Sequence, residues 1–287
     1  AMILRQIKEL AEEQLGEEVA GAVISCPAYF KDPARAATKE AGQLAGLNVL
    51  KIVNEPTAAA FAYGVHSGED SGEKLFVVYD LGGGTFDVTV IRMQGGVPEV
   101  IGSGGDPNLG GGDFDDRIVE WILGHIDRDP AYAGYRQILT DERCSALQRR
   151  LKIYAERGKI ELCNSTADEP AYRFDIPQVD VYEGKPVVFQ ETLTLVQFHD
   201  MIRQLLVERS LPWIDEALKA PFKNHNYTEE DITAVLLVGG STRVPLVRQL
   251  LEQRFANTEI RGREVGINPD EIVALGAAMI AADEDPD

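Results

Sequence analysis

Cysteine and histidine are scarce in this chain, which has three of the first and four of the second among its 287 residues. Cys26, Cys144 and Cys163 are far apart and odd in number, so they form no disulfide framework. No Cys-x-x-Cys pair or His–Cys cluster has the spacing of a zinc site. These absences favour a reducing compartment, and we expect the protein to be cytoplasmic.

Basic residues are also in deficit, with 28 Lys and Arg against 47 Asp and Glu and a net charge of −19. Such a charge repels nucleic acids and anionic membranes, so neither is an expected partner. No run approaches the ~18 consecutive apolar residues of a membrane-spanning helix. With 44% hydrophobic residues, the composition is that of an ordinary globular protein with one large or two medium domains.

Strands and helices are expected to alternate in the first part of the chain, which is typical of an α/β layer structure. Apolar residues at helical spacing predict a helix over 2–15, before Gly16. Short apolar runs and prolines at helix starts predict a strand over 19–25, a helix over 33–46, a strand over 49–53 and a helix over 56–64.

The rest of the chain is expected to be a β-meander followed by a largely helical region. The predicted strands are 75–81, 85–93, 97–102, edge strands within 170–191, and 234–238. The predicted helical segments are 109–125, 132–162, one long helix over 194–220, and helices that start at Pro245 and Pro269. Polar residues predict an exposed loop over 66–74 and a solvated end over 283–287.

The most informative stretch is the glycine run 82–84, which separates two predicted strands. Glycines at a hairpin turn allow positive φ and present consecutive N–H groups to one spot, which makes an anion site. Thr85 adds a hydroxyl, and Asp80 and Asp87 add carboxylates suited to a hydrated Mg²⁺. Together they predict a site for the terminal phosphates of a nucleotide; the alternative is a tight hairpin that only needs glycine.

Another glycine pair, Gly239 and Gly240, ends an apolar strand and is followed by Ser241, Thr242 and Arg243 before a helix. A strand–turn–helix junction of this kind lets a flat ring or a phosphate lie close to the backbone. The guanidinium of Arg243 suits stacking on a base such as adenine. A plain surface turn is the alternative.

Three charged residues allow either a functional or a structural interpretation. Glu55 ends a buried strand before Pro56, where its carboxylate either caps a helix or orients a metal-bound water. Glu156 and Lys159 are three positions apart and therefore share one helix face. The alternative to a ligand site there is a surface ion pair.

Several motifs occur in one order along the chain, and their order is the decisive feature. They are Cys26-Pro27-Ala28-Tyr29-Phe30, Asn54-Glu55-Pro56-Thr57-Ala58-Ala59-Ala60, Asp80-Leu81-Gly82-Gly83-Gly84-Thr85-Phe86-Asp87, Leu109-Gly110-Gly111, Gly239-Gly240-Ser241-Thr242-Arg243 and Asn268-Pro269-Asp270-Glu271. From about Val19 to Ala281, the chain resembles the ATPase domain of the seventy-kilodalton heat-shock chaperones of the DnaK type. The resemblance implies an α/β, actin-like ATPase (ribonuclease H-like) fold with two lobes around a nucleotide cleft, here the second lobe plus part of the first.

The resemblance also implies roles for individual residues. Asp80 would orient Mg²⁺ through water, Glu55 would hold a magnesium-bound or attacking water from the other lobe, and Thr85 and Asp87 would complete the catalytic set. ATP or ADP would be bound by Gly82, Gly83, Gly84 and Thr85 at the phosphates, by Glu156 and Lys159 at the ribose, and by Ile160, Cys163, Gly239, Gly240, Ser241, Arg243 and Asp270 around the adenine. Pro27 and Arg35 match residues that relay the nucleotide state to a peptide-binding domain.

Departures from the family pattern limit what we expect of this chain. The family begins with an Asp-Leu-Gly-Thr-Thr phosphate turn and has a catalytic lysine; neither is found here, so the chain resembles an N-terminally truncated domain. Cys163 stands where the family usually has serine, which gives the adenine pocket a weaker hydrogen-bonding partner. Phosphoryl transfer needs charge neutralisation from both sides of the cleft, so we expect little or no ATP hydrolysis by this chain alone.

By resemblance, the parent protein would be a chaperone that couples ATP binding and hydrolysis to peptide binding and protein folding. Its implied partners are a J-domain co-chaperone, a nucleotide exchange factor and unfolded polypeptide. We expect a partial first lobe at 1–66, the base of the second lobe at 67–108 and 193–287, and its upper subdomain at 109–192. The alternatives are a non-hydrolysing nucleotide-sensing relative and an actin-like sugar kinase or cell-division ATPase.

Overall fold

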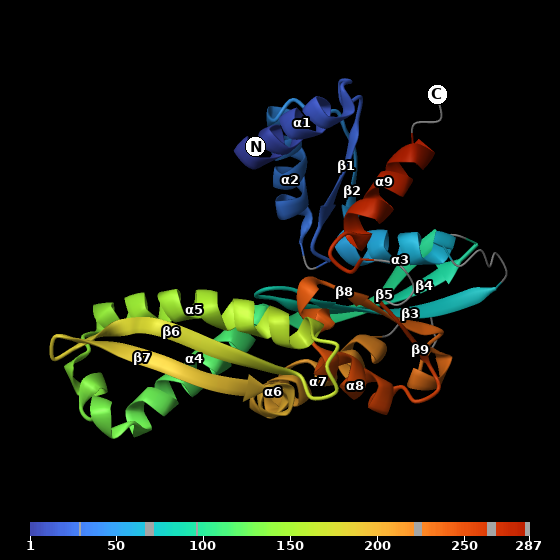
Figure 1. Ribbon diagram of the computed structural model, residues 1–287. Coiled ribbons are helices and arrows are strands. Elements are labelled where there is room, and N and C mark those ends of the chain that lie inside the picture. The colour runs from blue at the N-terminus through green and yellow to red at the C-terminus, as the bar shows by residue number, and fades with distance from the viewer. Residues whose placement is uncertain (29, 67–71, 96, 221–225, 263–267, 285–287) are drawn as a thin grey trace.

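The computed structural model describes residues 1–28, 30–66, 72–95, 97–220, 226–262 and 268–284 (Figure 1). The helices are α1 (Met2–Leu15), α2 (Asp32–Leu44), α3 (Glu55–His66), α4 (Gly111–Arg128), α5 (Asp141–Asn164), α6 (Leu195–Arg209), α7 (Leu211–Leu218), α8 (Pro245–Arg254) and α9 (Ile272–Glu284). Short 3₁₀ turns are η1 (Pro130–Tyr132), η2 (Tyr135–Ile138), η3 (Glu229–Asp231) and η4 (Gly240–Arg243). The strands are β1 (Ala22–Cys26), β2 (Val49–Asn54), β3 (Glu73–Leu81), β4 (Phe86–Gln94), β5 (Val97–Asp106), β6 (Ala171–Tyr182), β7 (Lys185–Thr194), β8 (Ala234–Val238) and β9 (Glu259–Arg261). Tyr29, residues 67–71 of the expected loop and residues 285–287 of the expected end lie outside the described residues.

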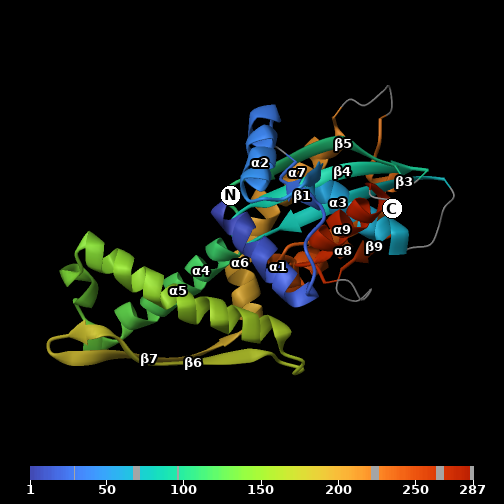
Figure 2. The ribbon, with the colours of Figure 1, turned by 90° about the horizontal axis from the view of Figure 1, so that it is seen from above.

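Five strands form a mixed sheet with the order β5-β4-β3-β8-β9. Figure 2 shows β5, β4 and β3 side by side in this sheet. β3, β4 and β5 are an antiparallel meander, as the sequence predicts, whereas β3, β8 and β9 run parallel. β3 and β8 lie inside the sheet and are buried along most of their length, which explains their continuous apolar sequences. Because Asp80 lies opposite Val238, both strands release their glycine turns at the same edge of the sheet.

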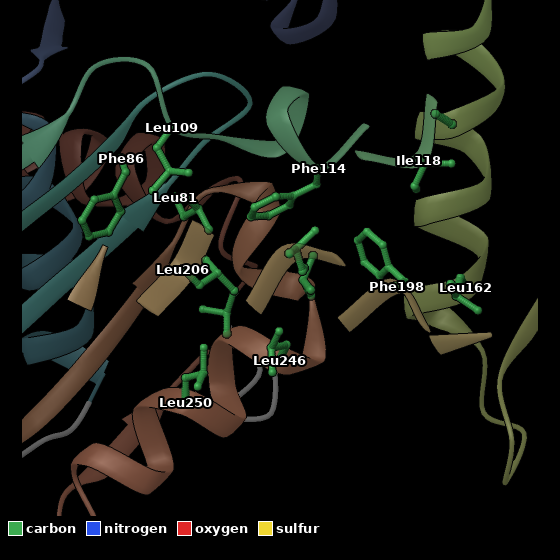
Figure 3. Close-up of a cluster of buried hydrophobic side chains, with 14 of the residues drawn as sticks. Leu81, Phe86, Leu109, Phe114, Ile118, Leu162, Phe198, Leu206, Leu246 and Leu250 are labelled. Carbon is green, nitrogen blue, oxygen red and sulfur yellow. The ribbon is translucent and has the colours of Figure 1, made fainter. Parts of the chain in front are cut away.

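Hydrophobic residues cover both faces of this sheet. Alternate residues of β3, from Leu75 to Leu81, join a large cluster with side chains of α4 to α8, while Phe76 and Val78 join α3 and α9 on the other face. Figure 3 shows part of the large cluster, in which Leu109 and Phe114 are fully buried. These two residues flank the first turn of α4, so the core fixes that turn beside the edge of the sheet.

The N-terminal elements form a smaller α/β unit above the sheet (Figure 1). β1 and β2 are parallel and pair with no other strand in the described ranges. α9 returns from the far end of the sequence to pack on α3 and β1, so closely that a Cβ at Gly276 would lie 1.9 Å from the carbonyl oxygen of Ala58. α1 exposes Ile3, Ile7 and Leu10, so this unit leaves apolar surface uncovered.

The region from α4 to β7 forms an arm that projects from the sheet (Figure 1). β6 and β7, the edge strands predicted within 170–191, pair as one antiparallel hairpin. Trp121 of α4 holds the hairpin through ring contacts with Phe174 and Phe189, at centroid distances of 5.8 and 5.5 Å. Such aromatic contacts add to the stabilisation from buried area.

Two helical predictions are wrong in detail. The expected single helix over 194–220 is two helices, α6 and α7, which meet at Ser210. Pro212 is the reason, because proline lacks an N–H and its ring displaces the carbonyl four residues earlier. The expected helical region over 132–162 becomes regular only at Asp141; before it, Gly134 adopts a left-handed backbone with a φ of 86°.

Candidate functional site

A cavity of about 770 Å³ lies where the edge of the sheet meets α4, α5 and η4. Many of the predicted site residues line it: Gly83, Glu156, Lys159, Ile160, Cys163, Gly240, Ser241, Arg243 and Asp270. Its other lining residues are Gly111, Gly112, Asp115, Asn164 and Val244. The cavity thus joins segments far apart in the sequence, whereas Gly82, Gly84, Thr85 and Gly239 lie outside its lining.

The glycine turn between β3 and β4 is tied to both α4 and η4. Gly82 donates its N–H to the carbonyl of Thr85 at 3.0 Å, which closes the turn. The carbonyl of Gly82 accepts hydrogen bonds from Ser241 Oγ at 2.8 Å and from the N–H of Gly111 at 3.0 Å. The first N–H group of α4 is therefore used to hold the turn and is not left for a ligand.

Close approach and open space, rather than a left-handed backbone, explain the glycines of this turn. None of the residues 82–84 has a positive φ, so the positive φ expected from the sequence is wrong. A Cβ at Gly110 would lie 2.4 Å from the nitrogen of Gly84, which requires glycine at position 110. Added Cβ atoms at Gly83 and Gly84 would meet nothing within 4 Å, and both residues are exposed. The turn therefore offers bare, accessible backbone, which fits phosphate oxygens.

Glu55, Asp80 and Asp87 line another, smaller cavity together with Pro27. Asp80 and Asp87 are cross-strand partners, and Glu55 comes from the first turn of α3. Burial, followed by the charges of Glu55 and Asp87, raises the pKa of Asp80 to about 7. Burial also raises the pKa of Asp87, and burial with the charge of Asp87 raises that of Glu55. The cluster holds an excess of negative charge that a cation would neutralise.

The donor set of this cluster suits a hydrated cation. No group of three His, Cys, Asp or Glu residues within the described ranges is placed to ligate a metal ion directly. Mg²⁺ usually keeps several of its waters and is held by one or two carboxylates and phosphate oxygens. The carboxylates also lie next to η4, since a Cβ at Gly239 would be 2.8 Å from Asp80 Oδ1. The chemistry of these carboxylates therefore suits Mg²⁺ held through water beside the glycine turn, whereas the cavity between them, about 10 Å³, has room for about one water and not for the hydrated ion itself.

Lys159 of α5 is bound to the start of α4. Its ammonium group donates to the carbonyl of Gly111 at 3.0 Å and pairs with Asp115 Oδ1 at 2.8 Å. Burial raises the pKa of Asp115, and the interaction with the nearby Lys159 offsets part of that shift. Glu156 forms no hydrogen bond or ion pair in the part of the chain that the structure describes. The Glu156–Lys159 surface pair, the structural alternative, is therefore not formed.

Arg243 is anchored by acceptors from the segment before α9. One guanidinium nitrogen donates to Asn268 Oδ1 at 2.6 Å and to Asp270 Oδ2 at 2.7 Å. Ile160 lines the same cavity, which gives an apolar side chain and a planar guanidinium suited to a flat ring. Burial raises the pKa of the Cys163 thiol to about 12, so this lining residue is a neutral, weak hydrogen-bonding group.

Pro27 and Arg35 have different surroundings. Pro27 lines the smaller cavity, the carboxylate cavity formed with Glu55, Asp80 and Asp87. Arg35 lines neither cavity described above. The guanidinium of Arg35 donates to Asn54 Oδ1, to the carbonyl of Ile52 at 3.1 Å and to Cys26 Sγ at 3.4 Å. Arg35 therefore braces α2 against β1 and β2.

A family model described as Hsp70 protein matches residues 1–286. The chain belongs to the Hsp70 family. The fold is accordingly the actin-like ATPase fold, with which the α/β architecture and the mixed sheet agree. Hsp70 proteins are chaperones whose nucleotide-binding domain generally binds ATP or ADP with Mg²⁺ and has ATPase activity. In the described parts of this Hsp70 chain, every helix is too short or too polar to cross a membrane.

Sequence reasoning missed several residues that line the larger cavity of this Hsp70 chain. Gly111 and Gly112 belong to a visible glycine run, which could have been assigned by analogy with residues 82–84. Asp115 gave no signal, because an aspartate in the second turn of a polar helix looks like a solvated side chain. Its importance arises only from its contact with another helix.

Proposed function

We propose that this Hsp70 chain is the nucleotide-binding part of an ATP-dependent chaperone and binds ATP or ADP across the two cavities. The observation that carries the proposal is the convergence of the glycine turn, α5 and η4 on one cavity large enough for a nucleoside. Glu156 and Lys159 then bind the ribose, Ile160 and Arg243 enclose the adenine, and the turn 82–85 receives the phosphates. Cys163, Gly239, Gly240, Ser241 and Asp270 complete the surroundings of the base.

Asp80 and Glu55 are the residues that we propose to hold Mg²⁺ through water, with Asp87 beside them. A bound Mg²⁺ neutralises charge on the phosphate oxygens. Because the pKa of Asp80 is raised to about 7, binding of the cation releases a proton near neutral pH. Thr85, exposed at the end of the glycine turn, contributes a hydroxyl on the phosphate side.

We infer that hydrolysis by this chain alone is slow. The described residues around the carboxylate cavity include no lysine or arginine. Lys159 is paired with Asp115, and Arg243 is paired with Asp270. Phosphoryl transfer depends on positive charge at the transferring group, so these residues support binding better than turnover.

The wider function that we propose is coupling of ATP binding and hydrolysis to peptide binding and folding, relayed through Pro27 and Arg35. A J-domain co-chaperone, a nucleotide exchange factor and unfolded polypeptide are the proposed partners. We propose the division into 1–66, 67–108 with 193–287, and 109–192; the arm from α4 to β7 supports the last boundary. The free thiols of Cys26, Cys144 and Cys163 support a reducing compartment, the cytoplasm.

Calorimetric titration of the chain with ADP and ATP, with and without Mg²⁺, tests the proposal. We expect weak, saturable binding with little distinction between ADP and ATP, because the adenosine end carries most of the contacts. Lys159→Met should weaken binding about tenfold through loss of a hydrogen bond from a charged donor. Lys152→Met is the matched control, since Lys152 is on the same helix but pairs with Asp116 at the surface. No binding of either nucleotide, or tight and strongly ATP-selective binding, would overturn the proposal.

A further inference from the structure

We propose that Asp115 sets the preference of this site for ribose over deoxyribose by positioning the ammonium group of Lys159. The proposal rests on the proposed nucleotide function and adds a residue from α4 to it. Asp115 is a positioning residue in this scheme, because it acts through Lys159 rather than on the nucleotide itself.

Asp115 is a buried carboxylate on α4. Asp115 is only 7% exposed, although it lies on a helix whose next residue, Asp116, is at the surface. A buried carboxylate is costly unless it is paired, and Lys159 supplies the charge at 2.8 Å. The side chain of Lys159 is itself 12% exposed, so solvent and salt screen this pair weakly. The pair therefore fixes the end of a flexible side chain.

Lys159 has more hydrogen-bond donors than its contacts with α4 use. A lysine ammonium has three N–H bonds and no acceptor. One donates to the carbonyl of Gly111 at 3.0 Å, and the nitrogen also lies 2.8 Å from Asp115 Oδ1 in an ion pair that lacks hydrogen-bond geometry. No other acceptor for the ammonium group is found among the residues that the structure describes, and Lys159 lines the cavity. The hydrogen bond and the ion pair, both to α4, thus hold the ammonium group in place and leave it donor capacity for a bound molecule.

The surroundings of Lys159 determine what its remaining donor capacity can recognise. Pairing with Asp115 cancels the charge of Lys159, so the group suits a neutral hydroxyl better than a phosphate. Glu156 lies one helical turn away, lines the same cavity and offers a free acceptor. Each hydroxyl of a vicinal diol both donates and accepts, so a fixed donor beside an acceptor matches the two ribose hydroxyls.

Selectivity for ribose follows from a donor that is held in place. A site built to bond a hydroxyl rejects an analogue that lacks it, because the site's own polar groups are then left unpaired. This penalty requires that the donor stay in place. Without Asp115, Lys159 keeps one anchor on a flexible four-carbon stem and can turn to water instead. Loss of Asp115 should therefore weaken discrimination more than it weakens binding of the deoxynucleotide.

The test compares dissociation constants of ADP, 2′-deoxy-ADP and 3′-deoxy-ADP for the whole chain and its variants. The unmodified chain should prefer ADP by about tenfold, and Asp115→Asn should reduce this ratio to about twofold. Asp116→Asn is the matched control and should leave the ratio unchanged, because Asp116 pairs with the exposed Lys152. In a Lys159→Met background, Asp115→Asn should cause no further change in the preference for ADP. Equal weakening of all three nucleotides, or full additivity in the double variant, would overturn the proposal.

A measurement without nucleotide separates this proposal from the proposed function. Lysine acylation followed by mass spectrometry should show Lys159 protected relative to Lys152 in the free chain. Asp115→Asn should increase acylation of Lys159 several-fold, whereas Asp116→Asn should affect Lys152 only. If nucleotides bind but Lys159 is acylated equally in the unmodified chain and in Asp115→Asn, this proposal alone fails. If no nucleotide binds, the proposed function fails and the proposal with it.

Discussion

Asp80 and Asp87 face each other directly across the ladder between β3 and β4, at the end of the sheet where the glycine turn begins. Like charges at opposed positions destabilise a sheet. Burial and the nearby carboxylates raise the pKa of Asp80 to about 7 and also raise the pKa of Asp87. These side chains therefore form an unfavourable charge arrangement, as is common at functional sites.

Asp80→Asn should stabilise the ligand-free chain above neutral pH. The folded-state pKa of about 7 exceeds the ordinary value of 3.8, so the folded state holds the extra proton between these values. Stability from this group is fully present below about pH 4, falls as pH rises from 3.8 towards 7, and is lost above 7. We expect a gain on the order of 2 kcal/mol in unfolding free energy at pH 8 and a clearly smaller gain at pH 5.

Urea unfolding at the two pH values checks this expectation, with the exposed Asp168→Asn as a control that removes one surface charge. Mg²⁺ should raise the melting temperature of the unmodified chain at pH 8 more than at pH 5. It should not raise the melting temperature of Asp80→Asn at either pH. An equal gain at both pH values would show that the charge of Asp80 is not the cause.

Alanine substitutions in the two glycine runs should separate folding from binding. Gly110→Ala would place a Cβ 2.4 Å from the nitrogen of Gly84, so we expect a loss of about 2 kcal/mol of stability. Gly84→Ala meets open space, so thermal unfolding should not change, but the affinity for ADP should fall and that for adenosine should not. A stable Gly110→Ala variant would contradict the packing described here.

Thr85→Ala should leave both the melting temperature and the rate of phosphate release unchanged. Thr85 is exposed at the tip of the turn, and turnover by the chain alone is expected to be close to background. Phosphate release measured over hours, with a reaction lacking protein as the reference, provides the test. Steady phosphate release by the unmodified chain that is abolished by Thr85→Ala would contradict this expectation. It would show that the positive charge around the phosphates is sufficient for hydrolysis.

Ser210→Ala should destabilise the chain by about 1–3 kcal/mol, because it leaves the buried hydroxyl of Tyr79 without its acceptor. Tyr79 donates to Ser210 Oγ at 2.8 Å, and both residues are fully buried. Tyr79→Phe in the same background should recover part of the loss by removing the unpaired donor. Ser145→Ala, at an exposed position of α5 with a similar bond to a helix carbonyl, should change stability far less.

Local features of this chain could be read from its sequence because they depend on neighbouring residues. The apolar run of β8 is found at 234–238 as predicted, and the meander of β3, β4 and β5 follows from strands separated by short glycine turns. The motif order likewise indicates the family that the family model matches. The break at Ser210 was also present in the sequence, since Pro212 cannot continue a helix.

The pairings that give the site its properties were decided by tertiary structure alone. The opposition of Asp80 and Asp87 depends on strand register, and the contact of Lys159 with Asp115 depends on how α5 packs against α4. The physical reason is that a charge's partner and its burial are properties of the space around it. Helical spacing places Glu156 beside Lys159, but Lys159 forms its ion pair with the buried carboxylate of Asp115 on the neighbouring helix.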